Sequence, residues 1–87
     1  MKRDVLLILV STRHESATTV QRILTEWGCY IKTRLGLHQD VLENCTESGL
    51  LFLELVGDKD KHKELARKLD LVRGVQAKLV NLEIEEE

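Results

Sequence analysis

Side chains that could bind a metal ion gather in residues 36–48, the longest stretch without helical or strand periodicity. The ligand types there are His38, Asp40, Cys45 and Glu47. Imidazole and thiolate groups suit zinc, nickel or iron, so His38 and Cys45 are the candidate metal ligands. Their spacing matches no strict metal-binding pattern, and a polar loop without a metal ion is the alternative interpretation.

A second candidate site lies where the first apolar segment ends. Ser11, Thr12 and Arg13 precede a predicted helix, whose exposed N–H groups and dipole favour an anion. Arg34, in a basic strip on a later strand, could pair with a carboxylate ligand at a subunit seam. The alternatives are a capping box formed by Thr12 and Glu15 and a solvated strand edge at Arg34. Ser11, Thr12, Arg13 and Arg34 are therefore the candidate residues for a small organic anion.

The remaining reactive side chains do not indicate catalysis. Cys29 alternates with Ile31 and Leu35, so we expect a small buried residue and not a nucleophile. His62 lies between two lysines and is expected at the surface. The turn after the first strand lacks the glycines that would cradle a phosphate. We expect no enzymatic activity and no cofactor, with a metal ion as the only exception under consideration.

Composition narrows the class of protein. The chain has 87 residues, enough for one domain, and a formal net charge of −2. A nucleic-acid-binding protein usually presents a basic face, and three aromatic residues are too few for a base-stacking surface. The apolar segment near the N-terminus is too short for a signal peptide or a membrane span. We expect a cytoplasmic protein with reduced cysteines, no membrane association and no direct binding to nucleic acid.

Hydrophobic periodicity predicts the elements that position these residues. Residues 5–10 and 50–56 are apolar on both faces, as expected for central strands. Residues 13–27 and 60–71 are amphipathic at helical spacing, and Gly28 and Gly74 follow them as expected C-terminal caps. Alternation predicts outer strands at residues 29–37 and 75–79, with Leu82 and Ile84 as an extension. Residues 83–87 are expected to form an acidic tail.

The two halves repeat as strand, helix, glycine, strand. Two such units predict an α+β, ferredoxin-like β-α-β-β-α-β domain over residues 1–87, with a four-stranded antiparallel sheet. The crossover rule places both helices on one face. The opposite face would then expose Leu50, Phe52 and Val56 with alternate residues of the first strand. This apolar surface predicts a homodimer or tetramer, formed through the open face or through edge strands.

Several motifs resemble those of the ACT-like iron-only hydrogenase system regulator family. The matching positions are Ile23, Leu24, Gly28, residues 34–37 (Arg-Leu-Gly-Leu), residues 49–51, Leu69, Leu71, Gly74 and Val75. The resemblance covers nearly the whole chain and implies a small oligomeric ACT-like regulatory protein, associated with hydrogenase and with a role in transcriptional regulation. Amino-acid-binding ACT domains usually place a glycine after the first strand, which this chain lacks. No helix-turn-helix is appended that would bind DNA.

The leading functional prediction is a regulatory module that oligomerises and senses a small molecule. One alternative is a metal-responsive sensor that uses His38 and Cys45. The other is a protein–protein assembly domain that binds no ligand.

Overall fold

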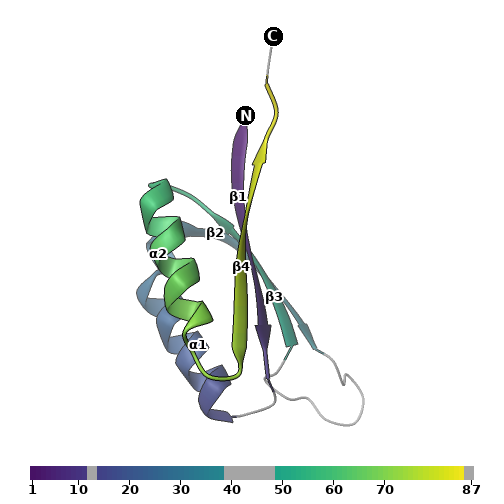
Figure 1. Ribbon diagram of the computed structural model, residues 1–87, viewed down its shortest axis with the longest axis vertical. Helices are drawn as coiled ribbons and strands as arrows, with labels where there is room; N and C mark the ends of the chain where they lie inside the picture. The colour runs from purple at the N-terminus through teal and green to yellow at the C-terminus, as the bar shows by residue number, and fades with distance from the viewer. Residues whose placement is uncertain (12–13, 39–48, 86–87) are drawn as a thin grey trace.

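The chain folds as an α+β sandwich in the predicted element order (Figure 1). The computed structural model describes residues 1–11, 14–38 and 49–85. Its elements are β1 (Lys2–Val10), α1 (His14–Glu26), a 3₁₀ turn η1 (Gly28–Tyr30), β2 (Ile31–His38), β3 (Gly49–Leu55), α2 (Lys59–Asp70) and β4 (Val75–Glu83).

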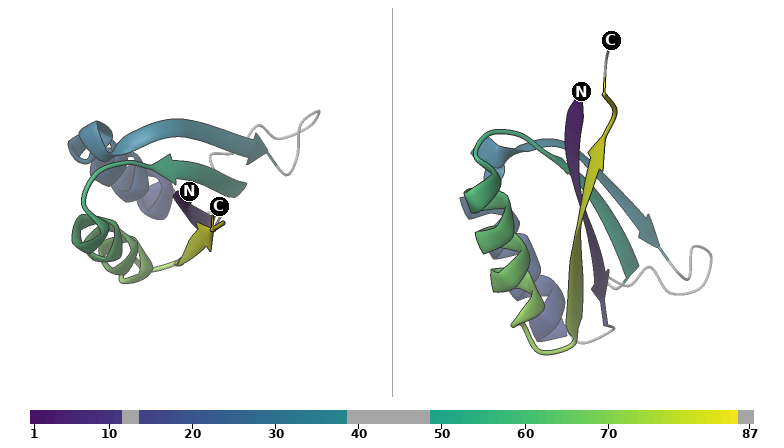
Figure 2. Two further views of the ribbon diagram at one scale, coloured as in Figure 1. Left: turned by 90° about the horizontal axis from the view of Figure 1, so that it is seen from above. Right: turned by 45° about the horizontal axis from the view of Figure 1, so that its top comes forward.

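The four strands form one antiparallel sheet in the order β2-β3-β1-β4. The two most apolar strands, β1 and β3, are therefore central, as their composition predicted. Both helices cover the same face of the sheet, and the other face carries no helix (Figure 2). This arrangement confirms the predicted ferredoxin-like fold.

The core lies between the helices and the sheet. Alternate residues of β1, namely Leu6, Ile8 and Val10, are buried against the helices. Leu53 from β3 and Leu65 from α2 are fully inaccessible to solvent within the same cluster. Complete burial of a leucine contributes about 1.5–3 kcal/mol, so this layer is the main source of stability.

The helices lie within about one residue of their predicted ends, whereas some strand and turn predictions were wrong. β4 continues through Glu83, so the predicted extension of this strand by Leu82 is confirmed, and the strand ends close to the predicted start of the acidic tail. Gly28 does not adopt the left-handed conformation expected of a helix cap, because the chain enters η1 at this residue. Gly74 has a positive φ of 78°, but the C-cap of α2 is Leu71, so Gly74 belongs to the turn before β4 and does not cap the helix.

β2 does not keep the alternation that the sequence suggested. Its register shifts between Ile31 and Thr33. A bulge of this kind adds one residue to one strand, so the faces exchange beyond it. Leu35 consequently pairs with Phe52 on the face away from the helices, and Arg34 turns toward α1. The prediction that Leu35 shares a face with Ile31 was wrong, because a bulge leaves no periodic signal in the sequence. Arg34 lies on the helix side of β2 but remains exposed to solvent.

β1 and β4 extend beyond the end of β3 as a two-stranded arm, which consists of residues 1–3 and 82–84. The last residue pair between β1 and β3 is Asp4 with Leu55, whereas pairing between β1 and β4 continues to Lys2 with Glu83. The backbone of Met1 also exchanges hydrogen bonds with Ile84. The arm is visible at the top of Figure 1. In the part of the chain that the structure describes, no helix is long and apolar enough to cross a membrane.

Candidate functional site

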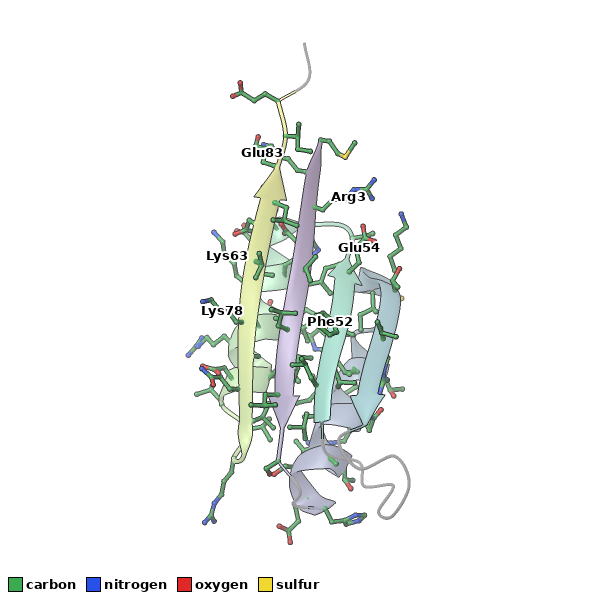
Figure 3. All side chains as sticks on the ribbon, turned by 90° about the vertical axis from the view of Figure 1, so that its right-hand side faces the viewer. Arg3, Phe52, Glu54, Lys63, Lys78 and Glu83 are labelled. Atoms are coloured by element: carbon green, nitrogen blue, oxygen red, sulfur yellow. The ribbon has the colours of Figure 1, made fainter. Side chains whose placement is uncertain are left out.

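The open face, the side of the sheet away from the helices, carries a continuous apolar surface. The strand register aligns Leu7 of β1 with Phe52 of β3 and then with Leu35 of β2. The neighbouring row aligns Val5 with Val80. All of these side chains are at least partly exposed to solvent (Figure 3). The sequence prediction of an apolar open face therefore holds, and the bulge in β2 adds Leu35 to it.

Charged groups on the open face lie toward its margins. Arg3 Nη1 donates to Glu54 Oε2 at 3.0 Å. Lys78 lies on the edge strand β4 and is exposed. Figure 3 shows Arg3 and Glu54 beside one another at the end of the face nearest the arm. An apolar centre with a charged margin is typical of surfaces that contact another protein.

Of the three predicted interface residues, Leu50 and Phe52 point to the open face and Val56 lies beyond it. Val56 follows the end of β3 and is partly exposed. Its N–H donates to Tyr30 O, and its carbonyl accepts from His62. Val56 therefore has a structural role in the connection between β3 and α2.

Ser11 and Ser16, on either side of the connection between β1 and α1, contact the turn between α2 and β4. Ser11 N donates to Gly74 O at 2.9 Å, and Ser16 Oγ donates to Arg73 O at 2.6 Å. A Cβ added at Gly74 would lie 2.5 Å from Ser11 Oγ and 2.8 Å from Ser16 Oγ. The two serines are thus in close contact with this turn. A hollow of about 370 Å³ beside them is lined in part by Ser16, Thr19 and Arg73.

The predicted anion-binding residues are not all brought together. Thr12 and Arg13 lie outside the described residues, so their part of the prediction is untested. Arg34 donates to Gln21 on α1 and pairs with Leu53. Leu53 in turn pairs with Leu6, four residues before the last residue of β1, which corresponds to about 13 Å along the strand. Within one chain, Arg34 is therefore remote from Ser11, and the subunit seam at which Arg34 is expected to bind an anion stays a prediction.

The predicted metal site remains a prediction. Cys45 lies outside the described residues, and for His38 the structure describes only its backbone position at the end of β2. Within residues 1–11, 14–38 and 49–85, no group of three or more His, Cys, Asp or Glu side chains is placed to hold a metal ion.

Two single-residue predictions were wrong. Cys29 is exposed, because it lies in η1 and not in the alternating strand to which the sequence pattern assigned it. His62 is buried, with only 3% of its surface accessible. It lies on the same side of α2 as Leu65 and Leu69, three and seven residues later, so helical spacing was the signal that its flanking lysines concealed.

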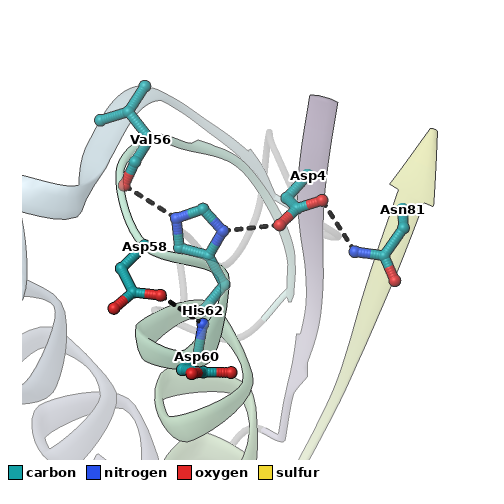
Figure 4. A network of polar contacts seen from close by, with 6 residues as sticks. All are labelled: Asp4, Val56, Asp58, Asp60, His62 and Asn81. Carbon is teal, nitrogen blue, oxygen red and sulfur yellow. Dashed lines mark hydrogen bonds and ion pairs between the residues drawn. The ribbon is translucent and has the colours of Figure 1, made fainter. Parts of the chain in front are cut away.

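His62 is the centre of a buried polar network (Figure 4). Its Nδ1 lies 2.6 Å from Asp4 Oδ2, and its Nε2 lies 2.8 Å from Val56 O. The second carboxylate oxygen of Asp4 accepts from Asn81 Nδ2 at 2.7 Å. Among the described residues, no buried side-chain nitrogen or oxygen atom lacks a hydrogen-bond partner. The network therefore satisfies its polar groups inside the fold.

The surroundings of Asp4 favour its ionised form. The hydrogen bond with His62 lowers the pKa of the Asp4 carboxyl below its ordinary value of 3.8, although burial opposes this effect. The hydrogen bond from Asn81 and the positive charges of His62 and Lys59 lower the pKa further. Asp4 was absent from the predicted sites, although a lone acidic residue in phase with Leu6 and Ile8 on an apolar strand was a detectable signal.

This pKa shift predicts a specific sensitivity to acid. A carboxyl group whose pKa is lower in the folded chain stabilises the fold at pH values above its pKa in the unfolded chain. This contribution is lost as the pH falls through the pKa of the group in the folded chain. We expect the free energy of unfolding of the wild type to decrease more steeply below about pH 4 than that of Asp4→Asn, which has no carboxyl group to protonate. Urea unfolding at a series of acidic pH values measures both slopes, and equal slopes would contradict the expectation.

The fold and its register define a ferredoxin-like domain of the kind found in ACT and PII-like proteins. The structure is similar to the crystal structure of the ACT domain of GTP pyrophosphokinase from Chlorobium tepidum, with 17% identity over 92% of this chain and 97% of that one and a TM-score of 0.60. It is also similar to a candidate PII-like signaling protein from Thermus thermophilus, with 11% identity over 94% and 88% of the two chains and a TM-score of 0.58. These similarities concern the fold.

A third similarity identifies the family. The uncharacterized protein TM1266 from Thermotoga maritima is 31% identical over 95% of this chain and all of its own, with a TM-score of 0.79. The chain belongs to the same family as TM1266. No protein-family model matches the sequence, and no curated protein matches it either.

Proposed function

We propose that this protein is a non-enzymatic regulatory module that self-associates through the open face of its sheet. Support for a regulatory role comes from the fold, which is that of the ACT domain of GTP pyrophosphokinase and of a candidate PII-like signaling protein. The sequence motifs that resemble those of the ACT-like iron-only hydrogenase system regulators support the same regulatory role.

The observation that carries the proposal is the uncovered apolar surface formed by Leu7, Leu35 and Phe52 with their neighbours on β1, β3 and β4. Contiguous exposed apolar patches of this kind mark interaction sites, since leaving them in water is unfavourable. A second copy of the chain is the occupant that we propose, because it supplies an equally apolar face whose charges lie at the margins. A two-fold dimer would pair the same patch on both subunits.

A feature of β4 favours the open face over the edge of the sheet as the main contact. Asp70 Oδ1 accepts from Ala77 N at 3.0 Å on the outer edge of β4. This side-chain cap occupies one of the backbone donors that an added strand would need, and such features discourage edge-to-edge pairing. We therefore place the proposed dimer contact on the face and not on the edge of β4.

Self-association is tested by replacing the central aromatic side chain. Phe52→Glu places a charge in the middle of the open face, where an aromatic residue is the expected anchor of an interface. We expect the wild type to sediment with twice the 10.0 kDa mass of one chain, and the variant to dissociate with a dissociation constant at least about thirtyfold higher. Analytical ultracentrifugation over a range of protein concentrations measures the change.

Leu71→Glu is the matched control. Leu71 is 74% exposed at the end of α2 and lies off the open face, so its replacement adds the same charge without affecting the proposed contact. We expect this control to retain the wild-type mass. A wild type that stays monomeric, or a Phe52→Glu variant that remains folded and fully dimeric, would overturn the proposal.

Regulation also requires an effector or a partner protein, and we propose a small organic anion as the effector. The hollow beside Ser16 and Arg73 is the place that we propose, because Arg73 supplies a positive charge there, although Glu15 also lines the hollow with a negative one. The ACT-like fold supports this assignment only at the level of architecture. A thermal-shift screen of the metal-free, reduced protein with amino acids, nucleotides and divalent cations would separate an anion effector from a metal effector.

A further inference from the structure

The ring of His62 lies between two groups that accept hydrogen bonds. The Asp4 carboxylate is 2.6 Å from Nδ1 and the Val56 carbonyl is 2.8 Å from Nε2. A carbonyl oxygen has no proton to donate, and an ionised carboxylate has none either. Both contacts are therefore hydrogen bonds only when both ring nitrogens carry a proton. The side chains of His62 and Asp4 are 4% and 5% exposed, so water does not replace a missing bond.

The lowered pKa of the Asp4 carboxyl supports placing the proton between Asp4 and His62 on the Nδ1 atom of the ring. The donated hydrogen bond from Asn81 Nδ2 occupies the other carboxylate oxygen and favours the same assignment. The two acceptors that flank the ring thus favour its doubly protonated form, with the Asp4 carboxylate on one side and the Val56 carbonyl on the other.

The His62 unit, formed by the ring with Asp4 and Val56, lies where the sheet narrows from four strands to the two-stranded arm. Asp4 and Asn81 are partners across β1 and β4, and Asp4 also forms the last pair with β3. His62 comes from α2, and Val56 belongs to the connection between β3 and α2. One ring therefore joins the base of the arm to the helix layer and to the end of β3, as Figure 4 shows.

Other attachments of the arm are weak by comparison. Beyond its backbone pairing, the arm makes two ion pairs among the described residues, with substantially exposed side chains. Lys2 pairs with Glu83 at 3.5 Å (57% and 57% exposed), and Arg3 pairs with Glu54 of β3 at 3.0 Å (49% and 27% exposed). Exposed pairs of this kind contribute little to stability. Charged groups near the His62 unit include Lys2, Arg3, Glu54 and Lys59, which line the same pocket, and also Asp58 and Glu83. Arg3 is paired with Glu54, and Lys2 with Glu83.

We propose that His62 is a protonation-dependent latch for the arm. With two ring protons, the ring holds the base of the arm through Asp4 and holds the β3–α2 connection through Val56. When the ring loses one proton to solvent, one of these two hydrogen bonds is lost. The ring then no longer ties the base of the arm to the β3–α2 connection, and the arm loosens. Met1, Leu82 and Ile84 are each more than half exposed on the arm, so loosening would also weaken self-association. That last consequence rests on the proposed function, whereas the latch itself does not.

Nuclear magnetic resonance tests the latch directly. The ring N–H signals of His62 report its protons, and amide hydrogen exchange reports the order of the arm between about pH 5 and about pH 9. The amide of Ile84, which donates to Met1 O, represents the arm, and that of Leu7 represents the centre of the sheet. We expect the protection factor of Ile84 to fall about tenfold when one ring N–H signal disappears, with that of Leu7 unchanged.

His62→Gln is expected to show low protection of the arm throughout this pH range, because no ring remains to protonate. His14→Gln, the same substitution at an exposed histidine on α1, is the control and is expected to match the wild type. The wild-type measurement needs no substitution, so the latch is tested even if His62→Gln does not fold. Protection of Ile84 that is unchanged when the ring loses a proton would overturn the proposal, as would a ring with a single N–H signal while the arm is protected.

The Phe52→Glu variant is expected to be monomeric. The same exchange experiment on this variant therefore tests the latch independently of self-association. If the chain is monomeric under all conditions, the proposed function fails, and the exchange of Ile84 still decides whether the latch exists.

Discussion

Replacing Asp4 with alanine is expected to lower the free energy of unfolding by about 3–5 kcal/mol. The substitution removes the acceptor for His62 Nδ1 and for Asn81 Nδ2, which lie 2.6 Å and 2.7 Å from the two carboxylate oxygens. It leaves a buried ring with an unpaired proton donor, and burial of an unsatisfied polar or charged group is among the most costly changes in a protein. Urea unfolding at neutral pH, followed by circular dichroism, measures the loss.

Two further variants make this measurement specific. Glu83→Ala removes an acidic residue whose ion pair with Lys2 is exposed, and we expect a change within about 0.5 kcal/mol. The double variant Asp4→Val, His62→Leu replaces the whole buried pair with apolar side chains. It is expected to be more stable than Asp4→Ala, because the buried ring that would lose its acceptor is removed as well. A loss below about 1 kcal/mol in Asp4→Ala would show that the pair is not buried and bonded as described.

Gly74→Ala is expected to destabilise the fold by about 2–4 kcal/mol, from strain and crowding together. At φ of 78° an L-residue is strained, which costs about 1–2 kcal/mol. The added Cβ would also lie 2.5 Å from Ser11 Oγ and 2.8 Å from Ser16 Oγ, so these side chains or the turn itself must move. Chemical denaturation of the wild type and the variant measures the difference.

Gly28→Ala is the matched control, because Gly28 has no positive φ and a Cβ there would meet nothing within 4 Å. We expect it to be neutral or slightly stabilising, since alanine restricts the unfolded chain more than glycine does. Equal effects of the two substitutions would show that the contact of Ser11 and Ser16 with Gly74 is not tight. A large loss at Gly28 would indicate that η1 is packed more closely than the structure shows.

Much of the architecture follows from local pattern. The apolar composition of β1 and β3 indicated central strands, the spacing of Val20, Ile23 and Leu24 indicated a helix, and the repeated order indicated a ferredoxin-like sheet. These inferences succeed because burial on a strand or helix imposes a fixed period on the sequence. The open apolar face followed from the same reasoning, since two helices on one side of a sheet leave its other side uncovered.

The candidate sites were less predictable, because they depend on contacts between distant segments. The link between Asp4 and His62 joins residues 58 positions apart, and the local sequence around His62, with a lysine on each side, suggested solvent exposure. The direction of Arg34 was decided by a bulge that leaves no periodic trace.

The sequence by itself thus determined the order of the elements, the identity of the core and the apolar open face, because these depend on the period of apolar residues. Only the tertiary structure decided that Cys29 is exposed, that Arg34 lies far from Ser11 and that His62 and Asp4 form a buried pair. The physical reason is that a polar side chain can be buried only where another part of the chain supplies its hydrogen-bond partner. The position of that partner is a property of the whole fold.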